Sequence, residues 1–186
     1  IVASTNVTVS GGDFAGQRGA HGLCSGTGHQ TGWLATPGAR AVGILLRDCE
    51  GCSVLGAKVN DIEGGRGGGG NFFEHYGSGI ARSQGHGTAG YAAGIALEGS
   101  STIGSTLSGN TLSDLRGGQQ PPCLQALCPA VTTSHQGALG VYVAEEARQN
   151  VIDETNMLSG EPILYRYGVN GEGLAGYTIT RQDLGT

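Results

Sequence analysis

The sequence predicts an all-β solenoid, a stack of β-coils built from short strands. Two observations lead to this fold class. Glycine makes up 37 of the 186 residues, which favours turns and strands, because each glycine inside a helix costs about 1 kcal/mol relative to alanine. The second observation is an internal repeat, in which short apolar alternations are separated by Gly, Asn, Asp or Ser at corresponding places. Such residues form tight turns, and alternation is typical of strands with one buried face.

Three copies of the repeat begin with a glycine and an apolar alternation, at Gly43, Gly94 and Gly140. The spacing of 46 residues from Gly94 to Gly140 recurs between Asn110 and Asn156. This agreement predicts that the last two copies share one register over their whole length.

A turn is predicted over residues 48–53 of the first full copy, and a partial copy over residues 7–14 precedes it. No copy can bury its apolar face alone, so the copies are expected to stack. Asn110 and Asn156 would then form a ladder of amide hydrogen bonds inside a turn. Gly12 and Ala57 occupy the equivalent places in the other copies, so the ladder is expected to be short. The alternative is that the two asparagines merely cap strands.

The repeat reads Gly-Ile-x-Leu, then a polar turn, then an alternation ending in Gly-Asn-x-Leu-x-Asp. This pattern resembles the repeat of right-handed parallel β-helix proteins, the pectate-lyase-like architecture. The glycine-rich run over residues 64–70, leading to Ala92-Ala93-Gly94-Ile95, resembles bacterial cell-surface β-helix proteins. The resemblance covers about residues 1–160. It implies a right-handed parallel β-helix of about four coils, with long Gly-rich inserts from one edge. A shared fold carries little information about activity.

The inserts are predicted at residues 16–41, 66–92 and 117–139, and they should leave successive coils at the same corner. Stacking then gathers them into one lateral surface, where function in a repeat protein usually lies. Imidazole and aromatic groups there suit the binding of sugars or of a protein partner. The candidate binding residues are His21, His29, Trp33, Phe72, Phe73, His75, His86, Tyr91 and His135. Alternatively, the aromatic residues form a satellite core beneath the loops.

The sequence favours a non-enzymatic protein over an enzyme. Gly85-His86-Gly87 resembles a tripeptide in the active site of polygalacturonases, but the aspartate motifs and the Arg-x-Lys of that site are missing. The histidines lack the spacing of metal ligands, so we expect no metal and no cofactor. Three acidic pairs are interpreted as solvated turn charges: Asp48/Glu50, Asp61/Glu63 and Glu145/Glu146.

Five cysteines in a chain with a single lysine indicate an oxidising compartment, and we expect an extracellular or cell-surface location. Cys123 and Cys128, which prolines flank, are predicted to form a disulfide in the third insert. Cys49 and Cys52 either bridge their own turn, or one of them pairs with Cys24. The five-cysteine count leaves one thiol unpaired.

A net charge of −5 with ten scattered basic residues argues against nucleic acid as a partner. No apolar run approaches the roughly 18 residues that a membrane span needs. Strand-like segments at both ends lead us to expect a single domain over residues 1–186, part of a longer protein, with further coils or subunits at its ends. Three functions remain: a structural or adhesive surface module that binds a surface glycan or protein, a carbohydrate-active enzyme (polysaccharide lyase or glycoside hydrolase) acting on an extracellular glycan, and an accessory subunit of a larger extracellular assembly.

Overall fold

The computed structural model describes residues 1–22, 36–68, 72–74, 81–83, 89–119, 137–144 and 146–162, which contain 17 strands and no helix. Of these strands, 14 fall into four repeats, numbered 1 to 4 along the chain. Repeat 1 contains β1 (Val2–Thr5), β2 (Thr8–Ser10) and β3 (Asp13–Ala15); repeat 2 contains β4 (Ala41–Glu50), β5 (Ser53–Leu55), β6 (Lys58–Asn60) and β7 (Ile62–Glu63); repeat 3 contains β10 (Ala92–Glu98), β11 (Thr106–Ser108), β12 (Thr111–Leu112) and β13 (Leu115–Arg116); repeat 4 contains β14 (Ala138–Val143), β15 (Val151–Ile152) and β16 (Met157–Leu158).

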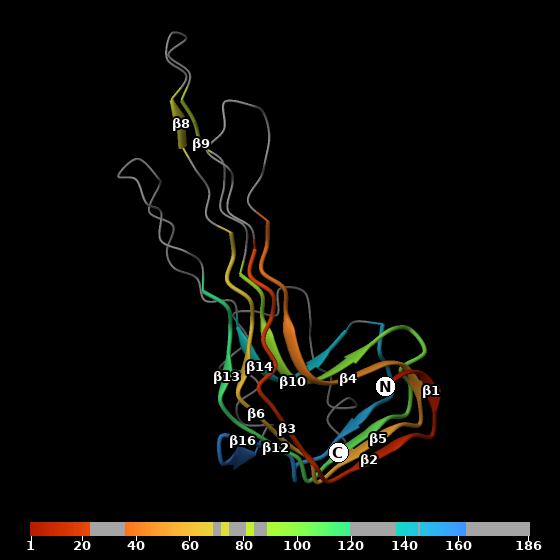
Figure 1. The fold of residues 1–186 in the computed structure, drawn as a ribbon. Helices are drawn as coiled ribbons and strands as arrows, with labels where there is room; N and C mark the ends of the chain where they lie inside the picture. Colours follow the sequence, from red (N-terminus) through yellow and green to blue (C-terminus); the bar gives the residue numbers. More distant parts are fainter. Residues whose placement is uncertain are drawn as a thin grey trace.

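Corresponding strands of the four repeats pair in parallel and form three sheets (Figure 1). The orders are β1-β4-β10-β14, β2-β5-β11-β15 and β3-β6-β12-β16, so each sheet takes one strand from each repeat, and the third sheet continues from β16 to a fifth strand, β17. β7 and β13 form a further parallel pair. Two pairs are antiparallel, β8 (Phe72–Glu74) with β9 (Ala81–Ser83), and β16 with β17 (Glu161–Pro162). The all-β class and the parallel pairing of the predicted copies are thereby confirmed.

The core draws its apolar side chains from corresponding positions of successive repeats. Leu97 pairs with Leu46 on one side and with Val143 on the other, and all three are fully buried. The second sheet contributes Val9, Val54, Leu107 and Ile152. The third sheet contributes Phe14, Val59, Leu112 and Leu158. Because burying one such side chain contributes about 1.5–3 kcal/mol, each repeat is stabilised chiefly by its neighbours.

The predicted asparagine ladder is confirmed. Asn110 Nδ2 donates to Asn156 Oδ1 at 2.8 Å, and both side chains are fully buried. Asn110 Oδ1 in turn accepts the backbone N–H of Ala57 at 2.9 Å. Strand pairing places Ala57 and Gly12 at the equivalent positions of repeats 2 and 1, as predicted. The ladder therefore ends at Ala57, because alanine has no side-chain amide that could continue it.

The prediction of one uniform register between the last two copies is wrong in their middle part. Thr106 pairs with Val151, and the contact between Ser105 and Asn150 spans 45 residues rather than 46. The first turn of repeat 4 is one residue shorter than that of repeat 3, and its second turn is one residue longer. This shift brings Asn150 Oδ1 within 2.9 Å of the Ser105 N–H, and Asn150 Nδ2 within 3.0 Å of the Thr102 carbonyl.

The turn predicted over residues 48–53 is also shorter than expected. β4 continues to Glu50 because β1 pairs alongside it, with Ser4 opposite Cys49 and Thr5 opposite Glu50. Asp48 adopts a left-handed backbone within this strand (φ 53°), and the chain turns at Gly51 (φ 62°). Turn-forming residue types therefore overstated the length of this turn, because pairing with a neighbouring repeat extends the strand.

The glycines that open the copies have a packing role. Gly43 and Gly94 lie beside each other in the first sheet, whose strands β4 and β10 bend along their length (Figure 1). A Cβ on Gly43 would lie 2.3 Å from Val59 Cγ1 and 2.7 Å from the Gly94 carbonyl oxygen. These positions leave no space for a side chain, so the sheet can approach the core closely there.

Candidate functional site

The bases of the three predicted inserts lie side by side, joined by backbone hydrogen bonds. The Ala39 N–H donates to the Ala20 carbonyl at 2.8 Å, and the Gly65 N–H donates to Ala39 at 2.8 Å. The Gly90 N–H donates to Gly65 at 2.9 Å, and the Gly118 N–H donates to Gly90 at 2.7 Å. One row of hydrogen bonds thus crosses five segments that leave the sheets together (Figure 1).

Only glycine fits at many positions of these bases. A Cβ on Gly65 would lie 2.0 Å from the Ala20 carbonyl oxygen, and one on Gly90 would lie 2.0 Å from the Ala39 oxygen. We call this contact zone the glycine layer; its members are Gly19, Gly22, Gly38, Gly64, Gly65, Gly90 and Gly118, each with a backbone atom within 2.2 Å of the position of a Cβ. The high glycine content therefore reflects close backbone packing as well as turns.

His21 lies at the edge of the glycine layer. Its Nδ1 accepts the backbone N–H of Arg66 at 3.0 Å, and its side chain is exposed. This hydrogen bond links the first insert to the start of the second. It also occupies one ring nitrogen, so His21 serves the packing of the insert bases.

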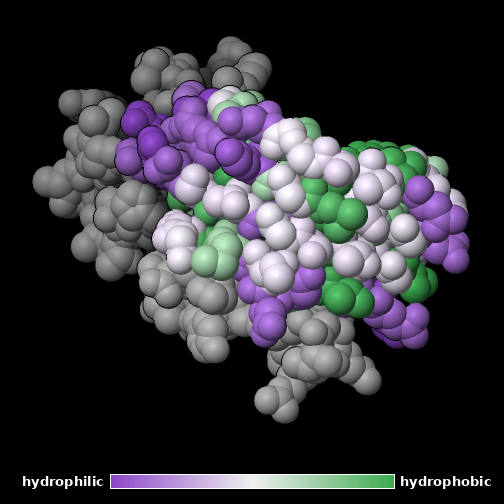
Figure 2. All heavy atoms as spheres, turned by 90° about the horizontal axis from the view of Figure 1, so that it is seen from below, coloured by the Kyte–Doolittle hydropathy of each residue, from purple (hydrophilic) through white to green (hydrophobic). Residues whose placement is uncertain are grey.

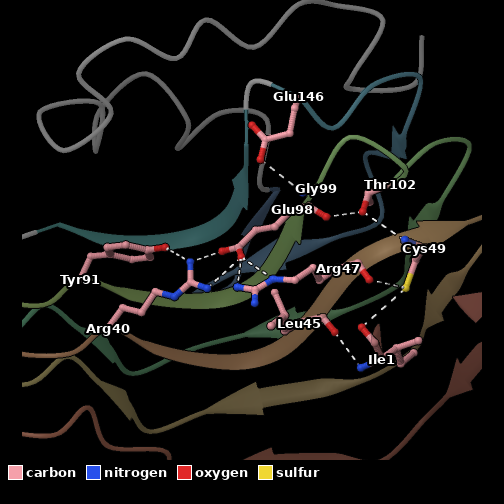
Figure 3. Close-up of polar contacts among 10 residues, drawn as sticks. All are labelled: Ile1, Arg40, Leu45, Arg47, Cys49, Tyr91, Glu98, Gly99, Thr102 and Glu146. Atoms are coloured by element: carbon pink, nitrogen blue, oxygen red, sulfur yellow. Dashed lines mark hydrogen bonds and ion pairs between the residues drawn. The ribbon is translucent and has the colours of Figure 1, made fainter. Parts of the chain in front are cut away.

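Tyr91, the last residue before β10, belongs to a polar cluster that sequence analysis missed (Figure 3). Arg40 Nη1 donates to Tyr91 Oη at 2.7 Å, and its guanidinium carbon lies 5.9 Å from the centroid of the Tyr91 ring. The ring centroids of Tyr91 and Tyr142 are 5.4 Å apart and the rings are tilted by 39°. With Arg47 and Glu98 these residues form what we call the charged corner.

The centre of the charged corner is the Glu98 carboxylate, whose residue is only 7% exposed. Arg40 Nη2 donates to Glu98 Oε2 at 2.8 Å, and Arg47 Nη2 donates to the same oxygen at 2.7 Å. Arg40 Nη1 also contacts Oε1. Burial by itself raises the pKa of Glu98, but the hydrogen bonds from Arg40 and Arg47 outweigh it and lower the pKa below the ordinary value.

This arrangement suits Glu98 to a structural role, in which its carboxylate links Arg40 and Arg47. A general acid needs a carboxyl whose pKa is raised, whereas two guanidinium groups keep Glu98 ionised. The repeat register contained a signal for the site. Arg47 and Glu98 are 51 residues apart, as are Arg40 and Tyr91, and this is the spacing of Gly43 and Gly94. Opposite charges at equivalent repeat positions become neighbours on adjacent strands.

Cys49 and Cys52 are free thiols in this structure and both are fully buried. The turn disulfide that the sequence offered as one alternative is therefore not formed here. Cys24, the other suggested partner, lies outside the described residues. Burial, together with a hydrogen bond to Cys52, raises the pKa of the Cys49 thiol.

Asp61 and Glu63, predicted to be solvated turn charges, are partly exposed, but Glu63 lies on β7 and both pair with one arginine. Arg18 Nη2 lies 2.7 Å from Asp61 Oδ1, and Arg18 Nε lies 3.5 Å from Glu63 Oε2. These side chains are 39–46% exposed, so the ion pairs contribute little to stability. Among the described residues no group of three or more His, Cys, Asp and Glu could hold a metal ion. Within the same ranges there is no helix that could span a membrane.

The other predicted site residues divide into two sets. Phe72 and Phe73 lie on β8, opposite Ser83 and Arg82 of β9. The remaining candidates lie outside the described residues: His29, Trp33, His75, His86 and His135, and the predicted disulfide pair Cys123 and Cys128. Of the nine candidate binding residues, the structure thus gives side-chain contacts for His21 and Tyr91.

Comparison with known proteins finds no matching family model, no matching curated protein and no matching solved structure.

Proposed function

We propose that the chain is a right-handed parallel β-helix module of an extracellular or cell-surface protein, and that it is a structural or adhesive scaffold whose inserts bind a ligand. Support for the β-helix comes from the three parallel sheets, in which the four repeats follow one another in the same order. The columns of buried apolar residues and the asparagine ladder fit the same fold.

The observation that carries the proposed function is the row of hydrogen bonds across the insert bases. It connects the chain near Ala20, Ala39, Gly65, Gly90 and Gly118. Loops whose bases are held this firmly reach a partner from defined starting points, which reduces the ordering cost of binding. A stack whose glycines hold the bases of the loops together is well suited to present those loops to a partner.

The ligand that we propose is a surface glycan or a surface protein. Imidazole and aromatic groups are concentrated in the insert sequences, and such groups stack on sugars and donate or accept hydrogen bonds. Figure 2, which views the molecule from below, shows several separate apolar patches among residues of intermediate or polar hydropathy. A surface of that kind favours the inserts over this face of the stack as the binding surface.

The test is to shorten the second insert above the glycine layer. Residues 69–88 are replaced by a Gly-Ser-Gly linker, which leaves Gly65 and Gly90 in place, and binding to an array of surface polysaccharides is measured. We expect the full chain to bind a subset of glycans and the shortened variant to bind the same glycans with an affinity at least about tenfold lower. Circular dichroism and Tm establish that the variant still folds.

Lys58→Ser, on the exposed face of β6, is the matched control and should bind like the full chain. Equal binding by the shortened variant would contradict the proposal. Release of reducing or unsaturated ends from a glycan, lost in His86→Ala, would favour the carbohydrate-active enzyme instead.

A further inference from the structure

Cys49 and Cys52 form a Cys-x-x-Cys pair at the corner between β4 and β5. Both side chains belong to the buried core cluster, and the two residues flank the turn at Glu50 and Gly51. Strand pairing places Thr102 and Ser105 at the equivalent positions of repeat 3. Repeat 2 therefore has two thiols where repeat 3 has two hydroxyls.

Each thiol faces a backbone carbonyl in β1 or in the residue just before it. Cys49 Sγ lies 3.6 Å from the Ile1 carbonyl oxygen, and Cys52 Sγ lies 3.7 Å from that of Ser4. Two buried cysteines three residues apart, on either side of one turn, have the spacing of the Cys-x-x-Cys motif, whose two thiols can form a disulfide.

We propose that Cys49 and Cys52 are a reversible redox site that forms an intramolecular disulfide in an oxidising environment and returns to two thiols in a reducing one. The oxidant is a small disulfide such as oxidised glutathione. One cysteine thiolate attacks it and releases one glutathione thiolate. The second cysteine then attacks the mixed disulfide and releases the other glutathione. Two S–H bonds break, one S–S bond forms, and the two protons and two electrons leave with two molecules of reduced glutathione.

β1 controls access to this site. It is the end strand of its sheet in the described part of the chain, and three of its four residues are exposed. Opening of this edge strand uncovers both thiols, and edge strands are among the elements that open most readily. Oxidation removes the S–H donors that face the carbonyls of Ile1 and Ser4, so it should also change the stability of β1.

Trypsin cleavage after Arg47 and Lys58 isolates a peptide, residues 48–58, whose only cysteines are Cys49 and Cys52. The full native chain is equilibrated in glutathione buffers from fully reduced to fully oxidised. It is then unfolded in an alkylating agent, digested and analysed by mass spectrometry. We expect one two-electron transition, from a doubly alkylated peptide to an unalkylated peptide that has lost two hydrogen atoms.

Cys49→Ser and Cys52→Ser should each abolish that product and leave a single reactive thiol. A second measurement is hydrogen exchange of residues 2–5, which should differ between the reduced and oxidised chains but not in Cys52→Ser. The proposal is overturned if the peptide stays doubly alkylated at every potential. It is equally overturned if oxidation only attaches glutathione to each cysteine or links them to Cys24, Cys123 or Cys128.

Discussion

The side-chain oxygen of Asn110 accepts the backbone N–H of Ala57, the residue at the same position in the preceding repeat, at 2.9 Å. Its side-chain nitrogen donates to the carbonyl of Val54 at 2.9 Å, three residues earlier in that repeat. Asn156 treats repeat 3 in the same way, accepting from the Asn110 N–H at 3.2 Å and donating to the Leu107 carbonyl at 2.8 Å. Each of these side-chain amides thus supplies hydrogen bonds to buried backbone groups in the turn of the preceding repeat.

Replacing Asn110 by alanine should lower the free energy of unfolding by about 3 kcal/mol, because the buried Ala57 N–H loses its acceptor and the Val54 carbonyl loses the Asn110 donor. Urea unfolding followed by circular dichroism measures the change. Asn60→Ala is the matched control, since Asn60 is only half-buried on β6 and bonds Asp13 at 2.9 Å. Its cost should stay below about 1 kcal/mol. Equal costs for the two variants would contradict the ladder.

Asn150→Ala tests the shifted register of repeat 4. Asn150 is fully buried and bonds the Ser105 N–H and the Thr102 carbonyl, so its loss should cost about 2 kcal/mol. Ser105→Ala keeps the backbone N–H that Asn150 binds, and should cost about 1 kcal/mol or less. Thermal unfolding of the two variants makes the comparison. A neutral Asn150→Ala would show that this residue does not face Ser105.

Gly65→Ala should disrupt the glycine layer. The added Cβ would lie 2.0 Å from the Ala20 carbonyl oxygen, and the resulting backbone shift should cost about 3 kcal/mol. Faster hydrogen exchange is expected at the Gly90 and Gly118 amides, which continue the same row of bonds. Gly104→Ala is the control, because that position has open space and only a positive φ of 66°, worth about 1 kcal/mol. If the two variants are equally stable, the layer is not closely packed.

Glu98→Gln should lower the free energy of unfolding by about 2 kcal/mol at neutral pH, because Arg40 and Arg47 lose their shared carboxylate. The pKa of Glu98 is lowered in the folded chain, so its contribution is complete above the unfolded value near 4.5 and is lost as pH falls through the folded pKa. The difference from the unmodified chain should therefore shrink in urea titrations as the pH is lowered below 4.5.

The exposed Glu63→Gln, which breaks one ion pair with Arg18, should cost less than about 0.5 kcal/mol over the same range. A Glu98→Gln effect that is independent of pH would mean that the charge of Glu98 contributes nothing at this corner.

The parts of the fold that could be predicted from the sequence are those that depend on alternation within a repeat and on a constant spacing between repeats. Alternation located the strands at Ile44, Ile95 and Val141, and the 46-residue interval located the pair Asn110 and Asn156. Both signals survive because parallel stacking brings equivalent positions together. Asn150 was missed because compensating changes in two turn lengths shift its register by one residue without altering the spacing on either side.

The 51-residue register carried a signal for only part of the charged corner, namely for the pairs Arg47 with Glu98 and Arg40 with Tyr91. Arg40 contacts Glu98 across 58 residues, and neither residue stands out locally as more than a surface charge. Only the stacking of β4 on β10 makes them partners. The glycine layer had no signal of its own in the sequence, because glycines that form turns and glycines that allow backbones to touch look the same there.

The order of the strands in the first sheet is tested most directly by through-space NMR contacts of the backbone at Ile95. Parallel stacking of successive repeats predicts contacts from Ile95 to Ile44 on one side and to Val141 on the other, with neighbouring pairs advancing in the same direction. Contacts whose partners advance in opposite directions along neighbouring strands, or a direct contact between Ile44 and Val141, would contradict parallel stacking in this order.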